Sequence, residues 1–399
     1  MKRLFISYMF PRKQGCSSEA RPPRRRTFNG KQRPEQKQLK ATSSPKAACF
    51  TRSRLCALIA GVCFIIALTL VPTSCIREDV YNDDPVGNFE ALWKIIDEQY
   101  CFLDYKAEKY GLDWDEVHER YRKLITADMT KKGLFEVLGN MLAELRDGHV
   151  NLYSTFDVAR YWAWHEDYPQ NFSDSIQRIY LGTDYKIASS LKYKILDDNI
   201  AYVYCESFEN GIGNGNLSDM LQDLAICNGL ILDVRNNTGG KLTTSTKLAE
   251  RFTNEKTLVG YICHKTGKGH SDFSSPQAVY LDPASGVRWQ KNVVVLTNRS
   301  SYSATNDFVN SMNQLPNVTL IGDWTGGGSG LPFSSELPNG WSVRFSASPM
   351  FDPQMNHLEF GIEPDIPVNM TSEDIKRGKD TIIECARKHL NDLYSGEAY

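Results

Sequence analysis

Ser303 lies where a buried strand is followed by a helix, a position that suits nucleophilic catalysis. The apolar residues 293–297 predict a strand ending at Asn298, and a helical pattern begins near Ser303. Backbone N–H groups and the helix dipole favour negative charge at the N-terminus of a helix. Serine is also a common N-cap residue, so Ser301 or Ser303 could have that purely structural role. Taken alone, this feature favours the structural role.

A second feature is a turn that closes on two glycines, Gly239 and Gly240. Residues 230–234 predict a buried strand, and a polar turn connects them to a further helical pattern. Paired glycines let the backbone approach a ligand and direct its N–H groups at an oxygen atom. The alternative is an ordinary strand-to-helix turn in which glycine supplies a positive φ angle.

Five motifs, taken in order, carry a resemblance to a known family. They are E-L-R-D-G-H at 144–149, D-V-R-N-N-T-G-G at 233–240, V-L-T-N-R-S-S-Y-S-A-T-N-D-F at 295–308, I-G-D-W-T-G-G-G at 321–328 and E-F-G-I-E-P-D-I at 359–366. Together they resemble the tricorn and C-terminal-processing (tail-specific) serine peptidases. The resemblance implies an α/β fold with a crotonase-like (ClpP/crotonase) domain, and it implies peptide-bond hydrolysis.

Departures from the family pattern favour its tricorn-like branch. In the tail-processing branch the general base is a lysine in the glycine-rich stretch after the nucleophile. Here that stretch is 325–329, and no lysine occurs between Lys291 and Lys376. The tricorn-like branch instead uses a histidine that is oriented by a glutamate, and His149 and Glu359 occupy those places. An imidazole near neutrality suits serine activation, and a carboxylate fixes its tautomer.

Alternatives remain for these assignments. His149 could simply interact with the C-terminal dipole of the preceding helix. Glu363 and Asp365 are equally acidic neighbours of Glu359 and compete with it for the third place. For the oxyanion hole, the resemblance supports the N–H of Ala304 together with that of Gly239 or Gly240, without choosing between the two glycines.

The elements that must position these residues follow from hydrophobic periodicity. Apolar residues at three- and four-residue spacing predict helices between 89 and 146, whereas short apolar runs alternate with helical patterns after residue 193. This alternation predicts a largely parallel sheet. The expected organisation is a tether at 76–88, a helical subdomain at 89–150, an irregular cleft-lining segment at 151–192, the crotonase-like catalytic domain at 193–371 and a closing helix at 372–399.

The N-terminal segment resembles an export signal. An uncharged apolar run at 55–71 follows Arg52 and Arg54, and a short exit of small residues leads to Cys75. This pattern resembles a bacterial lipoprotein cleavage site and predicts lipidation of Cys75, although a single membrane-spanning helix is the alternative. Residues 1–50 are basic and lack hydrophobic periodicity, which indicates disorder or a start site placed too far upstream.

Charge excludes nucleic acid as a partner of the body. Residues 1–54 hold 15 of the 46 basic and 2 of the 48 acidic residues, so residues 55–399 hold 31 and 46, a net charge of −15. The cysteines beyond Cys75 are five in number and lack metal-site spacing, so neither a disulfide scaffold nor a zinc site is predicted. No metal or organic cofactor is expected.

The sequence therefore predicts a periplasmic or surface-exposed, lipid-anchored serine peptidase that acts on peptides or unfolded proteins by a Ser303–His149–Glu359 mechanism. The interval between His149 and residue 193 is too short for a PDZ domain, so the sequence does not support specificity for free C-termini. One alternative is a catalytically inactive lipoprotein of the same fold that binds peptides or lipophilic ligands. A second is a thioester-processing enzyme of the wider crotonase fold, which the exported location disfavours.

Overall fold

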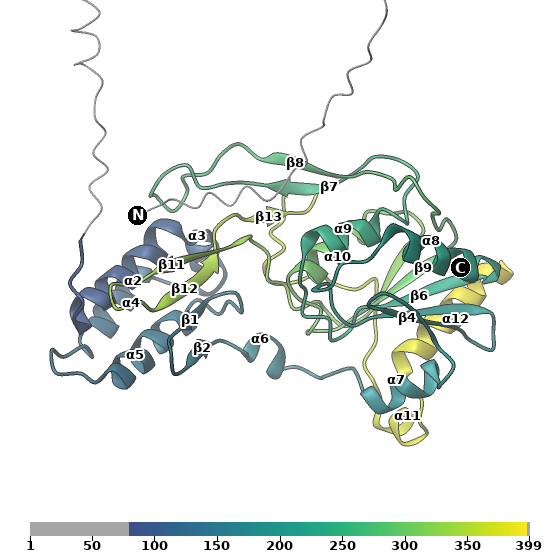
Figure 1. Ribbon diagram of the computed structural model, residues 1–399, viewed down its shortest axis with the longest axis horizontal. Coiled ribbons are helices and arrows are strands. Elements are labelled where there is room, and N and C mark those ends of the chain that lie inside the picture. The colour runs from purple at the N-terminus through teal and green to yellow at the C-terminus, as the bar shows by residue number, and fades with distance from the viewer. Residues whose placement is uncertain (1–79, 397–399) are drawn as a thin grey trace, which may run out of the picture. The chain divides into compact units, whose positions relative to one another are not determined.

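A seven-stranded sheet forms the core of the C-terminal part of the protein (Figure 1). The computed structural model describes residues 80–396. Five of the seven strands are parallel, and two antiparallel strands complete one edge. In spatial order they are β14 (Ile366–Pro367), β10 (Val318–Gly322), β9 (Val293–Thr297), β6 (Gly229–Asp233), β5 (Ile200–Cys205), β4 (Leu191–Ile195) and β3 (Lys186–Ala188).

Helices cover both faces of this sheet, which is why β5, β6 and β9 are buried along their whole length. Leu232 and Val295 pack on one face, and Ile231 and Val294 on the other. The first face is covered by α8 (Asn214–Asp223), α9 (Leu242–Ala249) and α10 (Ala304–Asn313), and the second by α7 (Asp174–Leu181) and α12 (Thr381–Ser395). The 3-10 turn η1 (Leu224–Ile226) continues α8.

The N-terminal part contains four helices, three of which begin with a side-chain cap. Asp84, Asp113 and Thr130 accept hydrogen bonds from the N–H groups of Gly87, Glu116 and Gly133 at 2.7, 3.0 and 3.1 Å. The helices are α2 (Pro85–Gln99), α3 (Leu103–Tyr110), α4 (Trp114–Arg122) and α5 (Lys131–Ala143).

A four-stranded antiparallel sheet packs against these helices, so this part of the protein is not purely helical. Leu152, Val343 and Phe345 from the sheet share one buried cluster with Phe89 and Leu92 of α2. The two segments on either side of Gly340, residues 332–336 and 342–346, form an antiparallel hairpin in this sheet. The sheet order is β11 (Pro332–Glu336), β12 (Ser342–Ser346), β1 (Asn151–Tyr153) and β2 (Val158–Arg160).

Three further segments differ from the expectation drawn from the sequence. The apolar run at 257–262 forms a strand outside the main sheet, because it pairs antiparallel with two other strands. The closing helix is interrupted at Gly378, whose φ is 70°. The segment 151–192, which was predicted to be irregular, contains three short strands, the first two residues of β4 and two helices. The elements not yet given are α6 (Ala163–Glu166), β7 (Thr257–Ile262), β8 (Gln277–Leu281), β13 (Met350–Phe351) and α11 (Ser372–Lys376).

Residues 1–79 and 397–399 lie outside the described part of the chain, and with them the predicted leader, Cys75 and residues 76–79 of the predicted tether. The end of the predicted tether, residues 85–88, forms the first turn of α2. Within residues 80–396 no helix combines the length and apolar character needed to cross a bilayer. The five cysteines in this range are free thiols: Cys101, Cys205, Cys227, Cys263 and Cys385.

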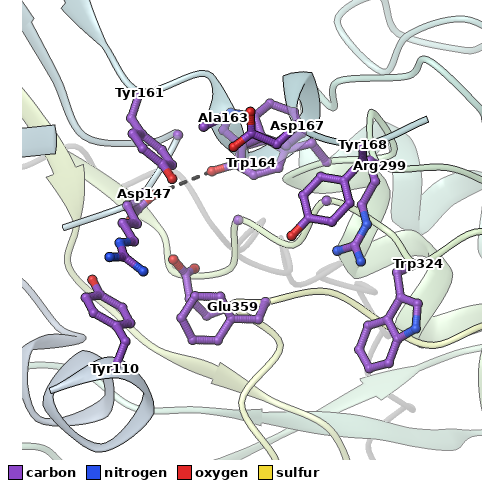
Figure 2. A pocket seen from close by; sticks show the side chains of 16 residues that line it. Tyr110, Asp147, Tyr161, Ala163, Trp164, Asp167, Tyr168, Arg299, Trp324 and Glu359 are labelled. Atoms are coloured by element: carbon purple, nitrogen blue, oxygen red, sulfur yellow. Dashed lines mark hydrogen bonds between the residues drawn. The ribbon is translucent and has the colours of Figure 1, made fainter. Parts of the chain in front are cut away.

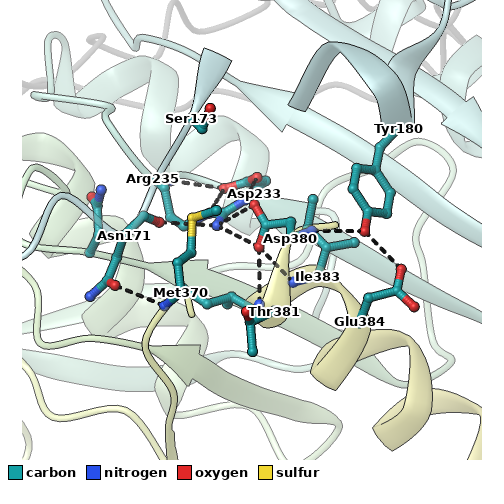
Figure 3. Close-up of polar contacts among 12 residues, drawn as sticks. Asn171, Ser173, Tyr180, Asp233, Arg235, Met370, Asp380, Thr381, Ile383 and Glu384 are labelled. Carbon is teal, nitrogen blue, oxygen red and sulfur yellow. Dashed lines mark hydrogen bonds and ion pairs between the residues drawn. The ribbon is translucent and has the colours of Figure 1, made fainter. Parts of the chain in front are cut away.

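A buried ion network attaches the C-terminal helix to the sheet (Figure 3). The guanidinium group of Arg235 lies 2.7 Å from Asp233 and 2.9 Å from Asp380, and all three side chains are fully buried. Asp380 also caps α12 by accepting from the N–H groups of Ile382 and Ile383. Arg235 belongs to the 233–240 motif, so part of that motif has a structural role next to the glycine turn.

Replacing Asp380 with alanine should lower the free energy of unfolding by about 3–5 kcal/mol, because it leaves the buried Arg235 charge partly uncompensated. Urea unfolding monitored by circular dichroism measures the change. The matched control is Glu373→Ala, which breaks the exposed pair with Arg377 and should cost less than about 1 kcal/mol. Equal effects of the two substitutions would contradict the structural role of the network.

Candidate active site

Ser303 occupies a strained backbone position between β9 and α10. Its φ of 59° and ψ of −121° lie outside the regions that non-glycine residues normally adopt. The surrounding turn holds it there: the Ser303 N–H donates to the Gly327 carbonyl at 2.9 Å, and the Ser301 hydroxyl donates to the Val234 carbonyl at 2.9 Å. Ser303 is the N-cap residue of α10, yet its side chain makes no capping hydrogen bond. Ser303 therefore begins the helix without using its hydroxyl group as a cap, which leaves that group available for other contacts.

The hydroxyl group of Ser303 instead contacts His149. The distance from Ser303 Oγ to His149 Nε2 is 2.9 Å, across 154 residues of sequence. His149 follows the turn after α5, where its backbone N–H donates to Asp147 Oδ1 at 2.7 Å. Its ring is buried, and the ring of Tyr302 packs against its edge with centroids 5.0 Å apart. Two of the predicted site residues are thus in direct contact.

Burial lowers the pKa of His149 to about 4, although the nearby Asp147 charge opposes the shift. The ring is consequently neutral at physiological pH, and in the tautomer protonated at Nδ1 its Nε2 accepts a hydrogen bond from Ser303. Nδ1 makes no hydrogen bond to any residue of the described range. The backbone carbonyl of Ser329 also acts on the ring, raising the pKa of His149.

Glu359 lies in the same buried region but makes no hydrogen bond to His149. Its Oε1 lies 2.8 Å from Lys106 Nζ, and its Oε2 accepts from the Ser329 N–H at 3.2 Å. Burial and the Asp147 charge raise the pKa of Glu359, and the ion pair with Lys106 opposes that shift. Of the competing acids, Asp365 accepts from the Leu320 N–H at 2.8 Å, a structural contact at the sheet edge.

Two residues of this site were not singled out from the sequence. Lys106 is fully buried on α3, and its position three residues after the buried Leu103 places a charge on the apolar face of that helix. A lysine on the apolar face of a predicted helix was the feature of the sequence from which Lys106 could have been identified. Asp147, from the 144–149 motif, accepts from the hydroxyls of Tyr100 at 2.9 Å and Ser346 at 3.1 Å.

The glycine turn approaches the serine closely. A Cβ atom on Gly239 would lie 2.9 Å from Ser303 Cβ and 3.0 Å from the Ala304 nitrogen, and the φ of Gly239 is 105°. The Gly239 N–H donates to Asn237 Oδ1 at 3.0 Å. The N–H groups of Gly240 and Ala304 make no hydrogen bond among residues 80–396. Of the two glycines, Gly240 therefore has the uncommitted donor.

A cavity of about 490 Å³ adjoins the Ser303–His149 pair (Figure 2). Neither of the two residues lines it, but Tyr302 and Gly148, which immediately precede them, do. The Trp164 ring of α6 stacks on Tyr302 with centroids 3.9 Å apart, and Tyr302 in turn packs against His149. Tyr161 and Trp164, from the segment 151–192 that was predicted to line a cleft, are among the residues that line this cavity.

Labelling of Ser303 by a fluorophosphonate should become half-maximal near pH 4 and remain level up to neutrality, because only neutral His149 can accept the serine proton. An unperturbed histidine would place the transition near 6.5. The measurement is the labelling rate as a function of pH.

Folding requires a control in the same pH range. The lowered pKa of His149 contributes stability that is present above about 6.5 and is lost as the pH falls through 4. Circular dichroism at each pH separates unfolding from titration of the folded site. A transition near 6.5 in fully folded protein would contradict the assignment of His149 as a buried neutral base.

A serine in contact with a buried histidine, beside a glycine turn, is the arrangement typical of serine hydrolase sites. Comparison with known proteins narrows this class. Residues 199–368 match the model of peptidase family S41, and residues 81–143 match the tricorn protease C1 domain. The chain belongs to peptidase family S41, a family of serine peptidases, and is thereby classed among the hydrolases.

Three proteins illustrate how far these similarities extend. A crystal structure of a candidate peptidase from Parabacteroides merdae is 57% identical, with a TM-score of 0.75, and covers 77% of this chain and 97% of that one. Mature CPAF complexed with lactacystin is 10% identical, with a TM-score of 0.65 over 78% of this chain and 99% of that one, a likeness of fold alone. A carboxyl-terminal-processing protease from Synechocystis sp. is 28% identical over 138 residues, which span 34% of this chain and 30% of that protein.

Proposed function

We propose that this chain hydrolyses peptide bonds through an acyl-enzyme intermediate on Ser303. The observation that carries the proposal is the 2.9 Å contact between Ser303 Oγ and His149 Nε2, made by a histidine whose burial keeps it neutral. A serine hydroxyl is a weak nucleophile at its ordinary pKa and needs an adjacent base.

The steps follow from this contact. Ser303 Oγ attacks the carbonyl carbon of the scissile bond while its proton passes to His149 Nε2. The protonated ring then transfers that proton to the leaving nitrogen, and the C–N bond breaks. Water, deprotonated by His149, attacks the resulting ester and releases the second product together with the free serine.

The N–H groups of Gly240 and Ala304 are the proposed donors to the tetrahedral oxyanion. They are uncommitted among the described residues, and the glycine turn is held directly against Ser303. Aligned N–H donors of this kind stabilise the charge that develops in the transition state. Because Gly239 has no side chain, the backbone of the glycine turn can approach Ser303 closely.

Glu359 is proposed to act on His149 indirectly. Glu359 accepts the Ser329 N–H, and the Ser329 carbonyl raises the pKa of His149, which favours the imidazolium ion formed during the reaction. Lys106 holds the Glu359 carboxylate from the opposite side at 2.8 Å. Glu359 and Lys106 are therefore positioning residues under this mechanism.

We also infer that the C-terminal part of the chain is a crotonase-like catalytic domain. The parallel strands β5, β6, β9 and β10, with Ser303 at the start of α10 and the glycine turn after β6, fit a crotonase-like domain. In such an arrangement two loops at the carboxyl ends of neighbouring parallel strands supply the nucleophile and the oxyanion donors.

We further propose export and lipid attachment at Cys75, which support a periplasmic or surface location. The support is the apolar run at 55–71 and its exit of small residues. Labelling with radioactive palmitate in a bacterial host tests it. Incorporation into the wild type but not into Cys75→Ser supports the anchor, and equal incorporation into both refutes it.

The test of the peptidase function is fluorophosphonate labelling of the full-length protein in detergent, followed by mapping of the labelled residue and digestion of denatured casein. Labelling at Ser303 together with casein cleavage is the expected result, and heat-unfolded protein is the control. A folded protein that neither labels nor cleaves would favour the catalytically inactive peptide-binding alternative.

A further inference from the structure

A second cavity, of about 610 Å³, lies on the face of the seven-stranded sheet that α7 covers (Figure 1). The helix α10, which begins after Ser303, covers the opposite face. The two cavities share no lining residue. The volume of the second cavity is within the range of about 300–1,000 Å³ that is typical of ligand sites. The proposed peptidase mechanism uses none of its residues, so its role is separate from that of Ser303.

One side of this cavity is formed by the outer strands of the sheet. Ile187 of β3 pairs with Lys192 of β4, and Lys192 pairs with Tyr204 of β5. Residues paired in this way across antiparallel strands project from the same face of a sheet. Lys192 and Tyr204 line the cavity, and the Lys192 Nζ atom lies 5.8 Å from the centroid of the Tyr204 ring. Strand pairing therefore fixes the positions of these two side chains.

The other side of the cavity contains a buried amide group without a partner. Gln177 of α7 lines the cavity and is only 4% exposed. Its Nε2 atom makes no hydrogen bond within residues 80–396. An unsatisfied buried donor costs stability, so its presence in a native structure requires an explanation. A ligand that accepts a hydrogen bond inside the cavity provides one.

The charged residues that line the cavity form two neighbouring pairs of opposite sign. Lys192 Nζ lies 3.3 Å from Glu206 Oε2. Asp174 and Arg178 are four residues apart on α7, which is the spacing of neighbours on a helix surface. Neither of these two side chains forms an ion pair in the described part of the chain. The lining therefore has no net charge, and each carboxylate has a cation as its neighbour.

This arrangement of charges favours one class of ligand. An anion would approach two carboxylates, a cation would approach two positively charged side chains, and an apolar molecule would desolvate all four groups. A zwitterion needs its two counter-charges at opposite ends of a site, whereas here they alternate. A hydroxyl group donates one hydrogen bond and accepts two, so it can bridge a carboxylate and the cation beside it. A molecule with several hydroxyl groups matches the cavity best.

We propose that this cavity binds a saccharide whose hydroxyl groups bridge the two charged pairs and accept a hydrogen bond from the Gln177 amide. The side chains of Ile179, Tyr185 and Tyr204 supply apolar surface for the C–H groups of the sugar ring. The chain then carries a glycan-binding site in addition to its peptidase site. This binding activity does not depend on the proposed function of Ser303.

The test is isothermal titration of the full-length protein in a detergent that has no sugar headgroup. The probes are the disaccharides cellobiose, maltose, lactose and N,N′-diacetylchitobiose, with the zwitterionic dipeptide Gly-Leu and inorganic phosphate for comparison. At least one disaccharide should bind with a Kd below about 1 mM. If no disaccharide binds, or if Gly-Leu or phosphate binds more tightly in a manner that requires Gln177, the proposal is overturned.

Two variants assign disaccharide binding to this cavity. Gln177→Leu removes the buried amide at similar volume, Arg178→Ala removes an exposed charge, and each should weaken binding about tenfold or more. The matched control Lys186→Ala changes a lysine of β3 that pairs with Asp223 and is absent from the cavity lining, so it should bind like the wild type. Unchanged binding in both cavity variants, when circular dichroism shows them folded, would place the site elsewhere and refute the proposal. Fluorophosphonate labelling of Ser303 should persist in both, so a failed saccharide site is distinguishable from a failed peptidase.

Discussion

Replacing Ser303 with alanine should lower kcat for peptide hydrolysis by about 10⁵- to 10⁶-fold, because the substitution removes the hydroxyl group that we propose forms the acyl-enzyme. His149→Ala should have an effect of similar size, since a serine–histidine pair acts as a unit and the two losses are not additive. The oxyanion donors remain in both variants, so a small residual rate above that of water is expected. The measurement is the initial rate of casein hydrolysis together with fluorophosphonate labelling.

A neighbouring serine provides the control for this prediction. Ser300 lies on the same turn, and its hydroxyl makes no hydrogen bond within the described range. Ser300→Ala should therefore label and cleave at a rate within about twofold of the wild type. Labelling that persists in Ser303→Ala, or is lost equally in Ser300→Ala, would show that the activated serine lies elsewhere.

The seven-stranded sheet next to Ser303 could be predicted, because each of its central strands is marked by its own run of apolar residues. The buried runs at 229–233 and 293–297 are continuously apolar, which is the pattern of parallel strands covered on both faces. The four-stranded sheet could not be predicted in this way. Its pairing joins Leu152 to Val343, and alternating burial indicates which face of a strand is covered but not which distant strand pairs with it.

The same distinction applies to the site. Ser303 and the glycine turn have local signatures, whereas His149 was found through the resemblance of its motif, since 154 residues separate it from the serine. Lys106 has no signature beyond a charge on the buried face of α3, and its partner Glu359 is 253 residues away. The expected orientation of His149 by Glu359 could not be checked from the sequence. Separation along the chain does not tell which side chains meet in a packed interior.

Replacing Lys106 with methionine should destabilise the protein by about 3–5 kcal/mol and slow the labelling of Ser303 by about 10- to 100-fold. The stability loss follows because Glu359 remains buried without its ion-pair partner. The rate loss follows because Glu359 also holds the Ser329 segment beside the His149 ring, where a displacement of about 1 Å is enough to affect the rate by this factor. Urea unfolding and labelling rates measure the two effects.

Two further variants separate positioning from a merely structural role. Lys109→Met changes an exposed lysine one turn along the same helix and should alter neither quantity appreciably. The double variant Lys106→Met with Glu359→Leu removes both buried charges, so most of the stability should return. Labelling should nevertheless stay slow, because the contact from Glu359 to the Ser329 N–H is then absent. Recovery of labelling in step with stability would mean that the Lys106–Glu359 pair serves folding alone and that His149 is oriented without it.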